Sequence, residues 1–121
     1  MKRLAVLALG CAVLVAGCSF ENKYEREAEK ITRAAMANNL SPVQNDLAKG
    51  LNISRVQVAE WSDELNAQGK LESIKEITTG CDPGAHCFDV KFEKHTYFEE
   101  LFLDDQDKVT SWRFKMKPDA T

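Results

Sequence analysis

The sequence predicts an α+β domain in which three N-terminal helices pack on a four-stranded antiparallel meander sheet. Before Gly69, apolar residues recur three and four residues apart, whereas after Gly69 they alternate with polar residues or gather in short runs rich in Ile and Thr. The turns between these later segments are short, so consecutive strands are expected to pair antiparallel. Helices followed by strands are typical of a domain whose helices cover one side of the sheet.

The first helix is expected over residues 21–38. One face of this segment is apolar and the other is charged, so the helix is expected to bury one side only. Its acidic residues come early and its basic residues come later, which is the order that the helix dipole favours. The apolar stripe consists of Tyr24, Ala28, Ile31 and Ala35.

Two further helices begin at similar signals. In Ser41-Pro42-Val43-Gln44, the serine is expected to cap a short helix and the proline to occupy its first turn, with an end near Gly50. The Ser-x-x-Gln spacing recurs from Ser54, and Gly69 is the expected C-terminal stop of this third helix. The buried face of the third helix is expected to hold Val58, Trp61 and Leu65.

Four strands are expected at residues 71–79, 88–93, 97–103 and 109–116. The apolar residues of the first strand do not alternate cleanly, which predicts a bulge or a partly buried second face. The last strand places Trp112, Phe114 and Met116 on one face. We expect these three residues and Trp61 to form core rather than a ligand pocket.

The N-terminal segment has the features of an export signal. A charged start, Met1-Lys2-Arg3, precedes an apolar stretch from Leu4 to Val15, which is shorter than the roughly 20 residues that a bilayer span needs. The end of the segment, Leu14-Val15-Ala16-Gly17-Cys18, resembles the lipobox of bacterial lipoproteins, with Val15 where leucine is commonest. The resemblance implies cleavage before Cys18, a diacylglyceryl group on its thiol and an acylated amino terminus, such as a palmitoyl amide. An ordinary secretory signal with an incidental cysteine is the alternative.

Removal of residues 1–17 would leave a lipidated tether, residues 18–21, and a single domain, residues 22–121. This mature chain carries 14 Lys and Arg and 19 Asp and Glu, a net charge of −5. Such a charge gives no electrostatic reason to bind nucleic acid or to lie on anionic lipid through a basic face, so membrane lipid is expected to be bound through acylated Cys18. In lipoproteins of double-membrane bacteria, a serine such as Ser19 after the lipidated cysteine favours the outer membrane, with the domain facing the periplasm.

The order of elements resembles the cystatin-like α+β fold of the nuclear-transport-factor-2-like superfamily. The similarity includes Gly69-Lys70 before the strands and a final strand pair that begins Tyr97-Phe98-Glu99-Glu100 and ends near Trp112. It covers roughly residues 22–116 and is nearest to small bacterial envelope proteins of unknown function. The resemblance implies a curved sheet that wraps over a helix and can leave an apolar pocket, which different relatives use for catalysis, binding or dimer formation.

Two thiols remain beside Cys18 once Cys11 has been removed with the signal, and these are Cys81 and Cys87. An even pair of cysteines in an oxidising compartment predicts a disulfide. Closing so short a loop is expected to stabilise the domain by about 2 kcal/mol. The spacing is not the Cys-x-x-Cys of a redox-active pair.

The sequence predicts neither a metal site nor a cofactor. Cys81, Cys87, His86, His95 and Asp82 are possible ligands, but they lack the paired short spacings of zinc sites, and oxidised cysteines do not bind metal as thiolates. Both histidines are expected in solvated loops or turns. The acidic run from position 104 to 107 lacks the glycine and the final glutamate of a calcium loop.

No residue is predicted to be catalytic. Asp89, Glu93, Glu99 and Glu100 are expected on a wet face of the sheet, and no nucleophile or phosphate-binding motif is present. Isomerase-type relatives of the fold use an Asp base with a Tyr or a protonated acid. Tyr97 with Asp89 would be the corresponding pair here, although Tyr97 is expected to pack between strands.

These observations predict a non-enzymatic, lipid-anchored bacterial envelope protein that acts as a small binding or scaffolding module. Its ligand would be an envelope protein or a small apolar molecule. One alternative is a pilotin-like assembly partner of an envelope complex, and another is an isomerase-like enzyme with a deep pocket and a buried carboxylate of raised pKa. An empty cavity under the sheet would favour a small ligand, whereas a filled one would favour a protein surface.

Overall fold

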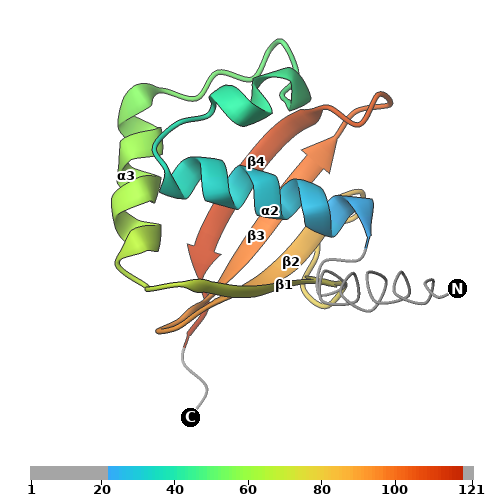
Figure 1. Cartoon of the computed structure of the whole chain (residues 1–121). Helices are drawn as coiled ribbons and strands as arrows, with labels where there is room; N and C mark the ends of the chain where they lie inside the picture. Colours follow the sequence, from blue (N-terminus) through green and yellow to red (C-terminus); the bar gives the residue numbers. More distant parts are fainter. Residues whose placement is uncertain (1–21, 119–121) are drawn as a thin grey trace, which may run out of the picture.

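The computed structural model describes residues 22–118, which form an α+β fold with a four-stranded antiparallel sheet, as predicted (Figure 1). The strands follow one another across the sheet in the order β1-β2-β3-β4, and each pairs antiparallel with the next. The three predicted helices are two α-helices and one 3₁₀ helix. The elements are α2 (Lys23–Met36), the 3₁₀ helix η2 (Ser41–Asp46), α3 (Arg55–Asn66), β1 (Leu71–Ile77), β2 (His86–Phe92), β3 (Thr96–Leu103) and β4 (Val109–Met116).

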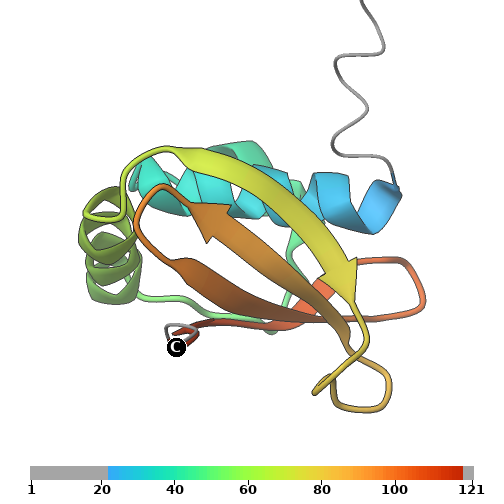
Figure 2. The ribbon, with the colours of Figure 1, turned by 90° about the horizontal axis from the view of Figure 1, so that it is seen from below.

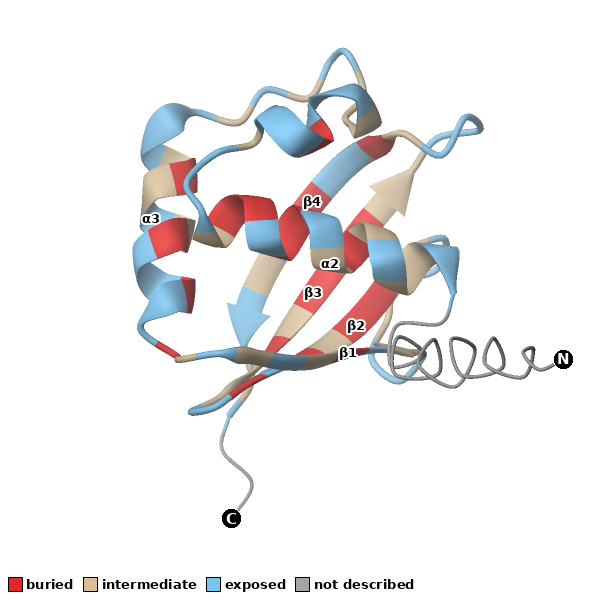
Figure 3. Cartoon of the chain, in the orientation of Figure 1, coloured by how far each residue is buried: buried red, intermediate tan, exposed pale blue. Residues whose placement is uncertain are grey.

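The helices form a layer on one face of the sheet, which we call the inner face (Figures 1 and 2). Helix α2 lies across the strands, and α3 packs beside it and reaches β4 through Trp61, whose ring centroid is 4.4 Å from that of Trp112. The other side of the sheet, which we call the outer face, has no helix over it (Figure 2). Buried residues gather between α2 and the strands (Figure 3). They include Ala28, Ile31, Ala35, Phe88, Val90, Tyr97 and Leu101.

Helix α2 forms where its apolar stripe predicts. Its N-cap is Asn22, whose Oδ1 accepts a hydrogen bond of 2.7 Å from the backbone N–H of Glu25. Ala28, Ile31 and Ala35 are fully buried. Because two of these three side chains are only a methyl group, the helix can lie close to the sheet and leave little space beneath it.

The prediction for the second helix is wrong in its cap and in its length. The structure has a six-residue 3₁₀ helix that ends at Asp46, and the side chain of Ser41 makes no capping hydrogen bond. Instead, the N–H of Ser41 donates to Oδ1 of Asn39 at 3.0 Å. The chain cannot continue as a helix to Gly50 because it pairs there with the sheet: the N–H of Ala48 donates to the carbonyl of Val109 at 2.8 Å.

Helix α3 begins as predicted. The N–H of Gln57 donates to the Oγ of Ser54 at 3.0 Å, and the helix ends at Asn66. Gly69 follows in the left-handed region, with φ of +89°, and a Cβ atom there would collide with the side chain of Glu93. That carboxylate accepts a hydrogen bond of 2.8 Å from the N–H of Lys70, so Gly69 lets the chain turn tightly into β1.

The sheet contains the bulge predicted for the first strand, between Leu71 and Ser73, and a second irregularity beside Leu103. Trp112 is buried and Phe114 is partly buried, because the ring of Trp61 packs against both. Met116 was predicted in the core, but its side chain is exposed. It lies near the end of β4, beyond the aromatic residues that Trp61 covers.

The two serines at helix starts give a matched test of the capping geometry. We expect Ser54→Ala to lower the free energy of unfolding by about 1 kcal/mol, because it removes a hydrogen bond to a helix N–H that has no other partner. Ser41→Ala is the control and should change stability by less than about 0.5 kcal/mol. Urea denaturation followed by circular dichroism measures both, and equal losses in the two variants would contradict this geometry.

Candidate functional site

The predicted lipidation site, Cys18, lies outside the described residues, as do the signal segment and the start of the tether. Its modification therefore stays a prediction. Within residues 22–118, no helix is both long enough and apolar enough to cross a membrane.

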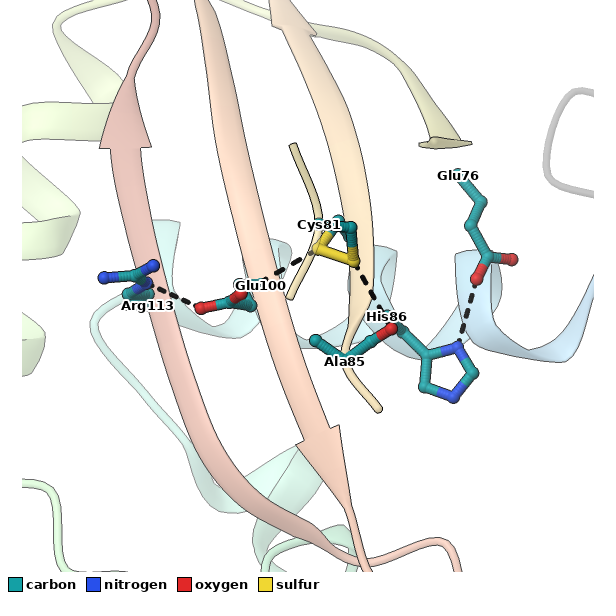
Figure 4. Close-up of a disulfide and its surroundings, with 7 residues drawn as sticks. Glu76, Cys81, Ala85, His86, Glu100 and Arg113 are labelled. Atoms are coloured by element: carbon teal, nitrogen blue, oxygen red, sulfur yellow. Dashed lines mark hydrogen bonds and ion pairs between the residues drawn. A yellow bond between two sulfur atoms is a disulfide. The ribbon is translucent and has the colours of Figure 1, made fainter. Parts of the chain in front are cut away.

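The predicted disulfide joins Cys81 to Cys87, with Cα atoms 5.7 Å apart, on the outer face of the sheet (Figure 4). Cys87 is fully buried. Its Sγ lies 3.9 Å from Oε2 of Glu100, and this is a packing contact, because an oxidised sulfur has no hydrogen to donate. The other oxygen of Glu100 accepts a hydrogen bond of 2.8 Å from Nε of Arg113.

The prediction that Glu100 lies on a wet face of the sheet is therefore wrong. Its side chain is only 5% exposed, enclosed between the disulfide and Arg113. The burial comes from the loop that the disulfide holds over the outer face, which strand alternation does not reveal. The carboxylate keeps an ion pair, so its burial is compensated.

The two histidines make structural contacts. The ring of His86 stacks on Tyr24, with centroids 3.9 Å apart, and its Nδ1 is 3.0 Å from Oε2 of Glu76. Nδ1 of His95 is 2.6 Å from Oε1 of Gln68. Across residues 22–118, no three His, Cys, Asp or Glu side chains are grouped so that they could hold a metal ion.

The same prediction is also wrong for Glu99, which is the most unusual residue of the domain. It faces inward with Tyr97 and Leu101 and is fully buried, instead of lying on a wet face. Apolar residues occupy both faces of β3, so the sequence does not show which of the two adjacent glutamates lies under α2. The structure buries both, one on each face.

The burial of Glu99 favours its neutral form. The Oγ1 of Thr32 is 3.0 Å from Oε1 of Glu99 and 2.7 Å from the carbonyl oxygen of Ala28. The one hydrogen of the Thr32 hydroxyl is therefore within donating distance of both oxygens. Burial raises the pKa of Glu99 well above its usual value, and the charge of Glu27 adds to this, while Thr32 and Trp112 oppose it.

Two polar atoms beside this chain of hydrogen bonds are left without a well-oriented partner among residues 22–118. They are Oε2 of Glu99 and Nε1 of Trp112. A charged carboxylate would be very costly at this position, whereas a protonated one is tolerated. The helix layer can therefore cover the inner face when Glu99 is neutral.

Tyr97 and Asp89, the pair that an isomerase-like enzyme would use, lie on opposite faces of the sheet. Tyr97 faces inward, and its hydroxyl donates to Oε2 of Glu64 at 2.8 Å. Burial raises the pKa of Tyr97, and the Glu64 carboxylate adds to the effect. Asp89 is paired with Phe98 on the outer face and accepts a hydrogen bond of 2.8 Å from Nζ of Lys117. The two residues do not form a site.

A cleft of about 260 Å³ lies between α2, the end of η2 and the turn from β3 to β4. Burial raises the pKa of Glu27 there to about 7, and a hydrogen bond to Asp46 adds to the effect. Burial opposes ionisation of Asp46 as well, but hydrogen bonds from Lys30 and Glu27 outweigh it and lower the pKa of Asp46. Nζ of Lys30 is 2.8 Å from Oδ2 of Asp46.

No local pattern predicts this pair of acids, because Glu27 and Asp46 lie on separate elements and meet only after folding. Glu27 can exchange a proton near neutral pH. Glu99, however, is absent from the lining of this cleft. A molecule in the cleft would reach a surface carboxyl group and not the buried acid.

A larger open groove, of about 600 Å³, lies between the end of α2, η2 and the start of α3. Apolar residues, amide side chains and Arg55 line it, and no carboxylate contributes to it. Glu99 is not part of this groove or of a third cleft beside the turn from β3 to β4. The lining residues of the groove include Asn38, Leu40, Gln44, Ile53 and Val58.

Comparison with known proteins adds no assignment. No protein-family model matches the sequence, and no similar chain was found among curated proteins or among solved structures. The resemblances to bacterial lipoproteins and to the nuclear-transport-factor-2-like superfamily therefore stay predictions.

The disulfide gives one test of the site. We expect the double variant Cys81→Ala/Cys87→Ala to lose about 2 kcal/mol of unfolding free energy, because the unfolded chain is no longer constrained by the closed loop. Urea denaturation of the unmodified protein with and without a phosphine reductant is the control, since it breaks the bond without changing a side chain. If full reduction, verified by mass spectrometry, leaves the urea midpoint unchanged, the stabilising role is wrong.

Glu99→Gln tests the neutral acid. Because the folded-state pKa of Glu99 is raised, its favourable contribution is complete below the unfolded-state pKa of about 4.3 and is lost as the pH rises through the folded-state value. In that window the free energy of unfolding should fall by up to about 1.4 kcal/mol per pH unit. The amide cannot ionise, so the variant should lose this part of the slope and gain stability relative to the unmodified protein between pH 5 and pH 7.

The control for this experiment is Glu60→Gln, which changes an exposed carboxylate on α3. Its pH dependence should match that of the unmodified protein, including the part that Glu27 contributes up to about pH 7. Urea denaturation at half-unit steps of pH gives all three curves. Parallel curves for Glu99→Gln and the unmodified protein would show that Glu99 is ionised in the fold.

Proposed function

We propose that this protein is a lipid-anchored component of a bacterial envelope, a small non-enzymatic binding or scaffolding module that acts through its exterior. The observation that supports this most directly is the filled inner face. Ile31, Phe88 and Leu101 are fully buried between α2 and the sheet, and the three clefts described above are open surface features that do not reach Glu99. A filled core leaves the surface as the place where a partner binds.

The way the domain begins supports attachment at its N-terminal end. Nδ2 of Asn22 donates to Oε1 of Glu76 at 3.1 Å, and Oε2 of Glu25 accepts from the N–H of Glu76 at 2.8 Å. Nζ of Lys23 is 3.0 Å from Oδ2 of Asp107. These contacts connect the first turn of α2 to β1 and to the turn from β3 to β4. A force applied to the chain at Asn22 would therefore act on both of these parts of the sheet.

A tether at Cys18 would hold this end close to a bilayer. Four residue steps separate Cys18 from Asn22, and a fully extended chain covers at most about 14 Å in that distance. Two or more acyl chains on Cys18 would make the attachment stable. The proposed location is the outer membrane, with the domain in the periplasm.

A pilotin-like assembly partner is the second candidate, and the filled inner face favours it over a carrier of small ligands. An isomerase-like enzyme is less well supported. It needs a buried carboxylate of raised pKa, and Glu99 is one, but it also needs a cavity at that carboxylate. Recovery of one envelope protein in stoichiometric amount from detergent-solubilised membranes would support the assembly partner over a general binding module.

Cys18→Ala tests the anchor, with Cys11→Ala as the matched control. When the full chain is expressed in a double-membrane bacterium, the unmodified protein and Cys11→Ala should begin at an acylated residue 18 and remain with the membranes. Cys18→Ala should carry no lipid mass. Intact-mass spectrometry and membrane fractionation measure both properties. Recovery of the unmodified protein in the soluble fraction, without lipid and with another first residue, would overturn the proposal.

A further inference from the structure

The outer face of the sheet differs in charge from the rest of the molecule. Its residues include three ladders, two of which cross all four strands, while the third ends at Lys117, one residue after β4, so their side chains share one face. The ladders are Ile77–Cys87–Glu100–Arg113, Lys75–Asp89–Phe98–Lys115 and Ser73–Lys91–Thr96–Lys117. These twelve positions hold five basic and two acidic residues, a net charge of +3, whereas residues 18–121 as a whole have a net charge of −5.

Both acidic residues of the three ladders are already paired. Glu100 accepts from Nε of Arg113 at 2.8 Å, and Asp89 accepts from Nζ of Lys117 at 2.8 Å. The remaining charges are Lys75, Lys91 and Lys115, and all three are exposed. Lys91 has one long contact, 3.8 Å, to Oε1 of Glu72, which is itself exposed and so holds it weakly.

Edge protection explains only part of this pattern. Lysines on an edge strand prevent unwanted strand pairing, and Lys115 on β4 fits that role. Lys91 lies on β2, a central strand with no edge to protect. Phe98 lies on the other central strand, β3, between Asp89 and Lys115, and is partly buried although α2 is on the opposite face. An apolar ring among basic residues suits the boundary between the headgroups and the acyl chains of a bilayer.

We propose that the outer face of the sheet lies against anionic lipid headgroups of the membrane that holds the anchor. This inference rests on the proposed function. It differs from the prediction made from net charge, which offered no electrostatic reason for the protein to lie on anionic lipid through a basic face. Three lysines attract an anionic surface only weakly when the protein is free in solution. An anchored domain, however, is already confined within a tether length of the lipid, so weak contacts are enough to orient it.

The position of the tether permits this orientation. Asn22 is hydrogen-bonded to the side chain of Glu76 on β1, and β1 is an edge strand of the sheet. The next residue along that strand, Lys75, belongs to the outer face. The tether therefore starts at an edge of the sheet, on the inner-face side of β1, and its span of up to about 14 Å is long enough to pass round this edge and let the outer face reach the bilayer that holds Cys18.

The reactivity of lysine amines tests the orientation within a single molecule. The lipidated protein, purified from membranes, is reconstituted into vesicles of phosphatidylcholine alone or with 30% phosphatidylglycerol and acetylated briefly with an uncharged reagent. Peptide mass spectrometry then gives the rate at each lysine. We expect Lys75, Lys91 and Lys115 to react at least threefold more slowly in the anionic vesicles at low salt, and this protection to disappear at 0.5 M salt.

Lys49 and Lys70 are the internal controls, because both are exposed and neither belongs to the three ladders. Their rates should be the same in both kinds of vesicle. Equal slowing of all five lysines, or slowing of none, would overturn the proposal. Protection in native membranes but not in vesicles of the extracted lipids would also overturn it and would assign the face to an acidic protein partner.

The mass of the same sample separates the two proposals. Absence of lipid on Cys18 means that the proposed anchor fails. A lipidated Cys18 with unprotected lysines means that the anchor holds and only the orientation is wrong.

Discussion

The contact between α2 and the inner face of the sheet is the constraint on which the rest of the structure depends. It works because the helix presents small side chains, Ala28 and Ala35, to the sheet and because burial favours the neutral form of Glu99, an acid beneath the helix. The hydroxyl of Thr32 lies within hydrogen-bond distance of both Oε1 of Glu99 and the carbonyl oxygen of Ala28. A charged Glu99 would draw in water or force the helix away, and the sheet would then have a hollow under it.

Because the inner face is closed, we propose that a partner binds on the exterior of the domain. The first turn of α2 is fastened to β1 through Asn22 and Glu25, so the end of the domain nearest the proposed anchor is well held. The disulfide closes a loop over the outer face and encloses Glu100 with its arginine partner. The exposed charged residues of the three ladders on that face are basic, although residues 18–121 as a whole are acidic, and net charge alone does not show this local pattern.

Local signals predicted local structure well. The order and antiparallel pairing of the strands, the cap at Ser54, the bulge near Leu71 and the disulfide each depend on a few neighbouring residues, and the structure confirms them. Most of the failures are tertiary. The second helix ends before Gly50 because the chain after η2 pairs with Val109, which is more than sixty residues away. The burial of both glutamates of β3 was not predicted, because apolar residues lie on both faces of this strand and alternation does not show which face is buried. The acids Glu27 and Asp46 meet only in the folded chain.

The ionisation state of Glu99 in solution tests the closed inner face most directly. Carbon-13 NMR of the side-chain carboxyl group, assigned by its loss in Glu99→Gln, follows this state as the pH changes. If the inner face is closed, the signal keeps the chemical shift of a protonated acid at pH values well above the usual pKa of a glutamate. A Glu99 signal that titrates at that usual pKa would mean that water reaches the inner face, and a pocket under α2 would have to be reconsidered.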